Sequence, residues 1–182
     1  MEKPFFRRWF NRAQVSAEPV EAQAERGNAD AQFYLGLQCA NAGGTSHDYE
    51  QAAQWYSKAA GQNHALAQFN LGMMYANGQG VCRNDTEAGM WFGKAAEHGD
   101  AGAQYNLGLG HYRASIRGLS EDMPESRIEA YKWFFLAAAQ GYRGSDSARA
   151  SVALKMTRQD VVEATQRIQA LMASNSGTPE IP

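Results

Sequence analysis

Residues 65–99 read ALAQFNLGMMYANGQGVCRNDTEAGMWFGKAAEHG: an apolar helical run, a glycine-rich turn and a second helical run. The same pattern occurs 36 residues upstream and again downstream. Three features recur with it, namely an Ala-Gln pair (31–32, 67–68, 103–104), a Leu-Gly pair (35–36, 71–72, 107–108) and a tryptophan (Trp55, Trp91, Trp133). Self-similarity at such a period is typical of stacked helical repeats. The sequence therefore predicts an all-α chain that forms one elongated unit.

Each repeat is expected to hold two helices, because a capping pair occurs at the same point of each motif. The pairs are an N-cap residue and an acid or amide three positions later (Asp48 with Gln51, Asn84 with Glu87, Ser126 with Glu129). Turn residues precede the first two pairs, with Gly43 and Gly44 in one repeat and Gly78 and Gly80 in the next. These signals place the start of the second helix in each repeat.

A glycine lies in the middle of the first helix of every repeat (Gly36, Gly72, Gly108). Glycine costs about 1 kcal/mol relative to alanine at such a position, so its recurrence indicates a shared structural cause. We expect the partner helix to approach closely there, with a small alanine opposite (Ala59, Ala95, Ala137) and the recurrent tryptophans filling the wider gap.

The third repeat is longer than the others, and the pattern degrades after it. About six extra residues lie between Tyr112 and Ser126, and an insertion in a repeat array maps to a loop on one face. That loop is either functional or simply lengthened. Residues 143–173 are expected to form a degenerate capping pair of helices, with Thr157 and Asp160 capping the second. The tail 174–182, rich in Ser, Gly and Pro, is expected to be disordered.

Residues 1–23 lie outside the repeat pattern. Phe6, Trp9 and Phe10 would share one helical face, with arginines largely on the others. Two interpretations remain open: the segment covers the end of the first repeat or is disordered, or residues 5–13 anchor the chain at a membrane surface. No continuous apolar stretch marks it as a secretory signal, and none elsewhere approaches the roughly 18 residues of a membrane span.

Composition and reactive residues argue against several functions. The formal net charge is -2, without the basic excess of nucleic-acid-binding domains. Cys39 and Cys82 are expected to be free thiols, which favours the cytoplasm. The histidines are scattered over turns and helix ends, in no metal-binding or catalytic pattern (His47, His64, His98, His111). No phosphate-binding motif is present. We therefore expect neither catalysis nor a cofactor.

The repeated unit, with AQFNLGMMYANGQGV followed by a capped helix bearing WFGKAA, resembles the Sel1-like repeat, a relative of the tetratricopeptide repeat. The resemblance covers about 29–64, 65–100 and 101–142. It departs from the family at Ala42 and Cys39, where glycine and tyrosine are expected, and at Cys82, where proline is common. The resemblance implies a right-handed α/α solenoid of three repeats with helical N- and C-terminal caps. It also implies a non-catalytic adaptor that binds other proteins or peptides.

The first helix of each pair lines the concave surface of such a solenoid. The predicted partner-binding residues form an aromatic row, an aliphatic row and a polar rim (Phe33, Leu37, Asn41; Phe69, Asn70, Met73, Asn77; Tyr105, Asn106, Leu109, Arg113). Two alternatives stay open, since the aromatic residues could instead pack between repeats and the asparagines at 41 and 77 could instead end their helices. A membrane-peripheral scaffold and an exported effector that binds a host protein are the alternative functions.

Overall fold

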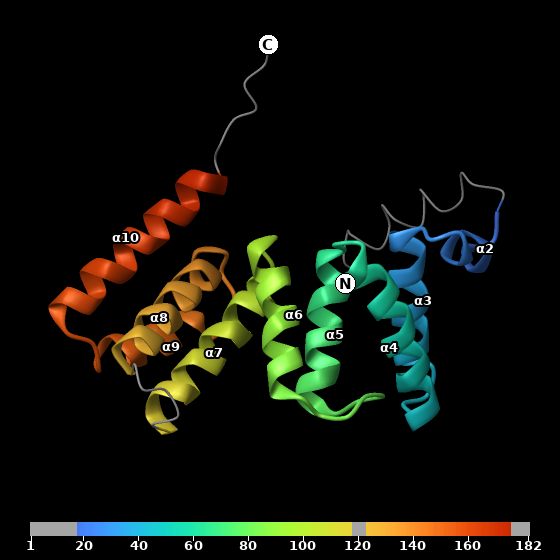
Figure 1. Cartoon of the computed structure of the whole chain (residues 1–182), viewed down its shortest axis with the longest axis horizontal. Helices are drawn as coiled ribbons and strands as arrows, with labels where there is room; N and C mark the ends of the chain where they lie inside the picture. Colours follow the sequence, from blue (N-terminus) through green and yellow to red (C-terminus); the bar gives the residue numbers. More distant parts are fainter. Residues whose placement is uncertain (1–17, 118–122, 176–182) are drawn as a thin grey trace, which may run out of the picture. The chain divides into compact units, whose positions relative to one another are not determined.

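The computed structural model describes residues 18–117 and 123–175, and all regular secondary structure within them is helical (Figure 1). The prediction of an all-α helical repeat protein is therefore confirmed. The aromatic segment at 5–13, the middle of the third-repeat insertion and the tail at 176–182 lie outside the described residues, so the predictions made for them stay open.

The chain divides into two compact units, and the boundary falls inside helix α6 (Asp85–Glu97) between Trp91 and Phe92. The first unit holds α2 (Val20–Glu25), α3 (Ala29–Asn41), α4 (Ser46–Gly61), α5 (Ala65–Asn77) and the start of α6. The second holds the rest of α6, α7 (Ala101–Arg117), α8 (Met123–Ala139), α9 (Ser145–Ala153) and α10 (Arg158–Asn175). In the first unit α4 packs against both α3 and α5, and in the second α8 packs against α7, α9 and α10.

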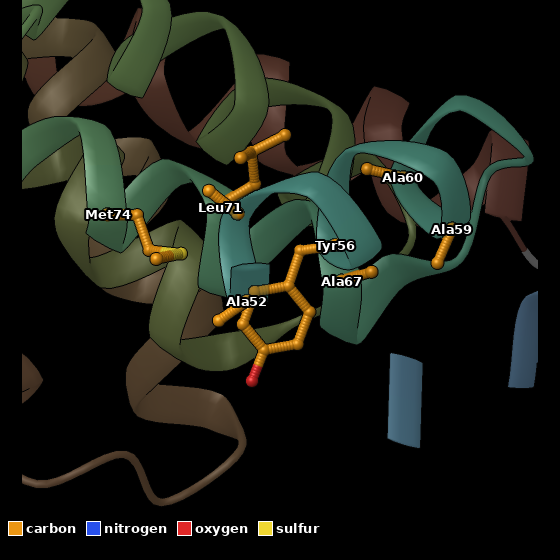
Figure 2. Packing of buried hydrophobic residues seen from close by; sticks show 8 residues of the cluster. Ala52, Tyr56, Ala59, Ala60, Ala67, Leu71 and Met74 are labelled. Carbon is orange, nitrogen blue, oxygen red and sulfur yellow. The ribbon is translucent and has the colours of Figure 1, made fainter. Parts of the chain in front are cut away.

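The core of the first unit is built mainly from alanines around one aromatic ring (Figure 2). Ala52, Ala59 and Ala67 are fully buried, and Tyr56 and Leu71 lie among them. Small side chains let helix backbones approach closely, and the larger side chains fill the space that remains. The recurrent alanines of the sequence are therefore packing positions of α4 and α5.

The mid-helix glycines do admit a close approach, but from a ring rather than from an alanine. A Cβ atom at Gly36 would lie 2.6 Å from the Cδ1 atom of Tyr56, and one at Gly108 would lie 2.8 Å from Cδ1 of Phe134. The prediction that alanines lie opposite these two glycines was therefore wrong. Tyr56 and Phe134, which directly follow Trp55 and Trp133 in the sequence, place their rings there.

Two of the predicted helix starts are confirmed by their hydrogen bonds. Oδ1 of Asn84 accepts from the backbone N–H of Thr86 and Glu87, so Asn84 caps α6. Thr157 and Asp160 exchange backbone and side-chain hydrogen bonds in a capping box at the start of α10. Both pairs satisfy backbone donors that the first turn of a helix leaves free.

Two other predicted caps were wrong. Thr45, and not Asp48, caps α4. Asp48 is the third helical residue, and its side chain completes a capping box by accepting from the Thr45 backbone N–H at 3.1 Å. Ser126 lies buried inside α8, which begins at Met123. The third repeat therefore begins its second helix earlier than the other repeats predict.

That shift also corrects the interpretation of the insertion as a loop. α7 and α8 each contain 17 residues, whereas α3 and α5 contain 13. Most of the extra sequence extends the two helices of the third repeat, and only residues 118–122 lie between them. The consequence is a longer helical hairpin rather than a long surface loop.

A buried glutamine joins each first helix to the helix before it. The Nε2 atoms of Gln32, Gln68 and Gln104 donate to backbone carbonyl oxygens eight residues earlier, at 2.9, 3.2 and 3.3 Å (Ala24, Ala60, Ala96). Gln62 and Gln140 add a second bond by donating to the Oε1 atoms of Gln32 and Gln104. Ala24 belongs to α2, and its carbonyl accepts from Gln32 of α3. In the same way, the Ala60 carbonyl of α4 accepts from Gln68 of α5.

We predict opposite effects for two alanine substitutions in α7. Gly108→Ala places a methyl group against the Phe134 ring and should lower the free energy of unfolding by about 1–3 kcal/mol. Gly110→Ala, two residues along the same helix, meets nothing within 4 Å and should raise it by about 0.5–1 kcal/mol. Urea unfolding followed by circular dichroism measures both values. Equal shifts in the two variants would contradict the close approach at Gly108.

Candidate functional site

Two of the polar residues predicted to bind a partner, Asn41 and Asn77, lie at the surface of the first unit. Asn41 and Asn77 are exposed and stand at the last positions of α3 and α5. The Nδ2 atom of Asn41 donates to the Leu37 carbonyl oxygen at 2.8 Å, and that of Asn77 donates to Oε1 of Gln79 at 3.2 Å. Asn70 and Met73 are half-buried on the same helix as Asn77. Amide groups and aliphatic side chains thus lie together on α3 and α5.

The aromatic residue of the first repeat packs between repeats. The ring of Phe33 stacks on that of His64, with centroids 4.6 Å apart and planes at 23°, and it lies 5.8 Å from the ring of Tyr56. Phe69, its equivalent in the second repeat, is half-buried. The Phe33 ring therefore stabilises the contact between α3 and the start of α5.

The third repeat, in the second unit, shows a similar arrangement. The ring of Tyr105 lies 5.5 Å from that of Phe134 and 5.2 Å from that of Tyr142. Leu109 also packs against this cluster. Asn106 is half-buried and donates from Nδ2 to the Gly102 carbonyl oxygen at 2.8 Å. Arg113 is exposed and makes no ion pair with the described residues.

His64 is a capping residue. Its Nδ1 atom accepts from the backbone N–H of Ala67 at 3.1 Å, and its Nε2 atom lies 3.5 Å from Oδ1 of Asp30. Burial lowers the pKa of His64 below 6.5, and the nearby Asp30 carboxylate opposes this shift without cancelling it. Asn28 and Asp100 cap α3 and α7 at the same position of their repeats. The neutral imidazole of His64 therefore caps α5 in the same way as the Asn28 side chain caps α3.

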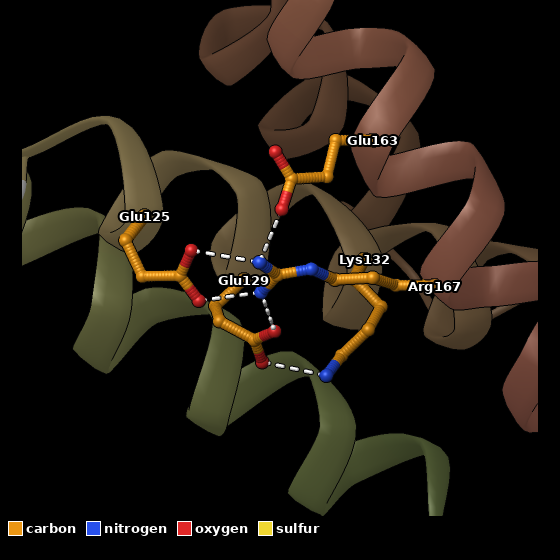
Figure 3. A network of polar contacts seen from close by, with 5 residues as sticks. All are labelled: Glu125, Glu129, Lys132, Glu163 and Arg167. Atoms are coloured by element: carbon orange, nitrogen blue, oxygen red, sulfur yellow. Dashed lines mark hydrogen bonds and ion pairs between the residues drawn. The ribbon is translucent and has the colours of Figure 1, made fainter.

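The densest group of charges lies in the second unit, where Arg167 of α10 points between carboxylates of α8 (Figure 3). Its Nη2 atom lies 2.8 Å from Oε2 of Glu125 and its Nη1 atom 3.0 Å from Oε1 of Glu129, and it also pairs with Glu163. Lys132 Nζ lies 2.6 Å from Oε2 of Glu129. The cluster ties α10 to α8.

Each of the three carboxylates in this cluster contacts a cation, with Arg167 shared by all three and Lys132 contacting Glu129 as well. Hydrogen bonding from Arg167 holds the pKa of Glu125 below its usual value. Burial opposes ionisation of Glu129, but Lys132 and Arg167 together still lower its pKa. Within residues 18–117 and 123–175, no group of three His, Cys, Asp or Glu side chains is placed to hold a metal ion. No helix in the same residues is both long and apolar enough to span a membrane.

The helix pairs, the recurrent glutamines and the ring-on-glycine contacts follow the same boundaries as a known family model. The Sel1 repeat model matches residues 29–64, 65–100 and 101–142. The chain belongs to the Sel1 repeat family. The Sel1 repeat is a helical module that generally mediates protein interactions and is typically non-catalytic. None of the curated protein sequences compared with this chain matches it.

The solved structures that are similar to the chain include two Sel1-type repeat proteins. One is a Sel1 repeat protein from Oxalobacter formigenes, 31% identical, with a TM-score of 0.59, covering 72% of this chain and 95% of its own. The other is a protective antigen of uropathogenic Escherichia coli strains with an SLR fold, 22% identical, with a TM-score of 0.62. That match covers 89% of this chain but 43% of the antigen, so this Sel1 repeat protein spans less than half of the antigen's length.

The sequence pattern noted the recurrent Ala-Gln pair but assigned no role to the glutamine. Gln68 is fully buried, with 0% of its surface exposed to solvent. The signal that could have identified the role of the glutamine is a polar residue that recurs, repeat after repeat, among the apolar positions of the first helix. A buried amide needs a hydrogen-bond partner, so its recurrence there indicates a recurring contact within the repeat array.

We predict that His64→Asn reduces the acid sensitivity of the fold. Because the folded-state pKa of His64 lies below its unfolded value, its stabilising effect is complete above about pH 6.5 and is lost as the pH falls. Asparagine caps equally well without titrating. The difference between the unfolding free energies at about pH 7.5 and about pH 5.5 should be smaller for the variant than for the original chain. A part of the difference should remain, because burial also lowers the pKa of His111. An unchanged difference between the two pH values would contradict the role of His64.

We also predict that Arg167→Leu lowers the free energy of unfolding by about 1–3 kcal/mol, because it leaves the Glu129 carboxylate, 18% exposed, with one cation fewer. The matched control is Arg149→Leu, which removes one ion pair to the 78% exposed Asp146 and should cost less than about 0.5 kcal/mol. Thermal and urea unfolding check both values. A loss no larger for Arg167→Leu than for Arg149→Leu would show that the cluster does not stabilise α10.

Proposed function

We propose that this Sel1 repeat protein is a non-catalytic adaptor that binds a peptide or a partner protein through the first helices of its repeats. The binding residues in the first unit are Leu37, Asn41, Asn70, Met73 and Asn77, with Asn106 and Arg113 as their counterparts in the third repeat. One observation carries the proposal: Asn41 and Asn77, one repeat apart, are both exposed beside half-buried aliphatic side chains on α3 and α5.

The chemistry of this set suits an extended or helical peptide. Each asparagine amide presents both a donor and an acceptor, which is what a peptide backbone requires. Leu37 and Met73 provide apolar anchor positions, and Met adapts to ligands of varied shape. Phe33 and Tyr105 already pack within the fold, so they support the helices that carry the site instead of forming its surface.

The proposal also covers organisation and location. We propose that residues 29–142 form the interaction module and that α9 and α10 close its C-terminal end as a capping pair. Cys39 and Cys82 are both free thiols, which favours a reducing compartment such as the cytoplasm. Membrane attachment through residues 5–13 falls outside the described part of the chain and remains a separate hypothesis.

The test has two stages. A photo-reactive amino acid replaces Met73 in one variant and the exposed Gln54 of α4 in a control, and partners crosslinked in native lysate are identified by mass spectrometry. We expect a partner that crosslinks at position 73 and not at position 54.

The affinity for that partner is then measured with substituted chains. Asn41→Ala combined with Asn77→Ala should weaken binding about tenfold or more, and adding Arg113→Ala should weaken it further. Gln54→Ala should leave the affinity unchanged. Equal affinity for the substituted and the original chain, with helicity preserved, would remove the proposed surface.

A further inference from the structure

The lengthened hairpin of the third repeat extends beyond the helix that packs on it. At 1.5 Å per residue, α7 and α8 are each about 25 Å long, whereas the nine-residue α9 is about 13 Å long. Val152 of α9 is fully buried against Phe134 of α8, and Tyr105 and Tyr112 of α7 pack on the same cluster. One turn beyond Tyr112, α9 no longer covers α7, and the Ile116 side chain is 55% exposed.

Further apolar side chains gather at this uncovered end. Met123, one turn before Arg127 on α8, is 42% exposed, and Leu154, directly after α9, is 89% exposed. The neighbouring contacts place them together: Lys155 Nζ lies 5.2 Å from the Tyr112 ring centroid, and Arg127 Nη1 donates to the Lys155 carbonyl oxygen at 2.7 Å. We call the six residues around this end the overhang surface: Tyr112, Ile116, Met123, Arg127, Leu154 and Lys155.

Four basic side chains with no ion pair to a described residue lie in or beside the overhang surface. Arg113 and Arg117 are exposed on α7, and neither these nor Arg127 or Lys155 makes an ion pair with a residue that the structure describes. Elsewhere in the same unit Lys132, Arg149 and Arg167 are paired with carboxylates, whereas Arg143 and Arg158 make no ion pair with a described residue. Arg117 directly follows the exposed Ile116, so a basic and an apolar side chain lie next to each other at the end of α7.

We propose that the overhang surface docks an acidic amphipathic segment of a partner protein. Apolar side chains of the segment would cover Ile116, Met123 and Leu154, which removes apolar surface from water. Its carboxylates would pair with the guanidinium groups of Arg113, Arg117 and Arg127, whose planar donors match a carboxylate in two-bond geometry. An amphipathic helix or strand presents both kinds of side chain on one face.

A protein segment suits this surface better than a membrane does. Attachment to a bilayer uses a long, continuous apolar face, whereas the apolar part here is three side chains wide. The overhang surface is formed by α7, α8 and the end of α9, and of the residues in the function proposed above only Arg113 takes part in both proposals, so this one goes beyond that function. Failure of either one would leave the other standing.

The first test measures binding of the full chain to fluorescent peptides of about twelve residues by anisotropy. One peptide alternates Glu with Leu, a second has Gln in place of Glu, and a third has Lys in place of Glu. We expect the acidic peptide to bind at least tenfold more tightly than the other two, with an affinity that falls as salt is added. Glu121 and Asp122, in the undescribed residues 118–122, also carry charge, and the salt titration reports the net sign. Equal binding of the three peptides overturns the proposal.

The second test locates the binding. Leu154→Ser and Arg117→Glu change exposed side chains without ion pairs, so the fold should be preserved, and together they should weaken binding of the acidic peptide at least tenfold. The matched controls, Met172→Ser on α10 and Arg143→Glu, should leave it unchanged. Equal losses in both pairs overturn the proposal. Binding to phosphatidylserine vesicles without binding to the acidic peptide does so too, since it would indicate a membrane.

Discussion

Each first helix is held to the helix before it by one buried amide. The glutamines at 32, 68 and 104 donate to carbonyl oxygens in the last turn of the preceding helix, each of which also accepts from the backbone N–H three residues later. Burying an amide costs free energy unless it is hydrogen-bonded, so only one register of the two helices is favourable. The alanine core and the ring contacts at Gly36 and Gly108 depend on that register, because sliding one helix along the other would move the small residues away from the side chains that pack against them.

The repeat period and the fold class could be predicted because many positions recur together, but single neighbours could not. Trp55 and Tyr56 differ by one residue, or about 100° around the helix, and spacing alone does not say which of the two meets Gly36. The same holds at the start of α4, where Thr45 and Asp48 are both good caps and three positions apart. Asp85 and Thr86 compete with Asn84 in the same way, but only Asn84 has a glutamate three positions later, and its prediction was confirmed.

For the candidate site, the sequence identified which side chains share a stripe but not what covers each one. Phe33 and Leu37 lie on the same helix, yet the ring of Phe33 stacks on His64 because the next repeat begins beside it. In the third repeat Leu109 packs in the cluster around Val152, whereas Ile116, on the same stripe, is exposed because α9 is short. How far α9 extends along α7 depends on a different part of the chain, so the sequence pattern of α7 alone does not predict it.

The six-residue α2 has a consequence for association between molecules. Its Ala24 carbonyl occupies the amide of Gln32, which in the other repeats is the group that joins one helix pair to the preceding one. With α2 in place, the Gln32 amide is already hydrogen-bonded within the chain and is not available to a helix terminus of another chain. A repeat fold can in principle extend by one helix pair after another, and α2 occupies the amide through which a further pair would join at this position.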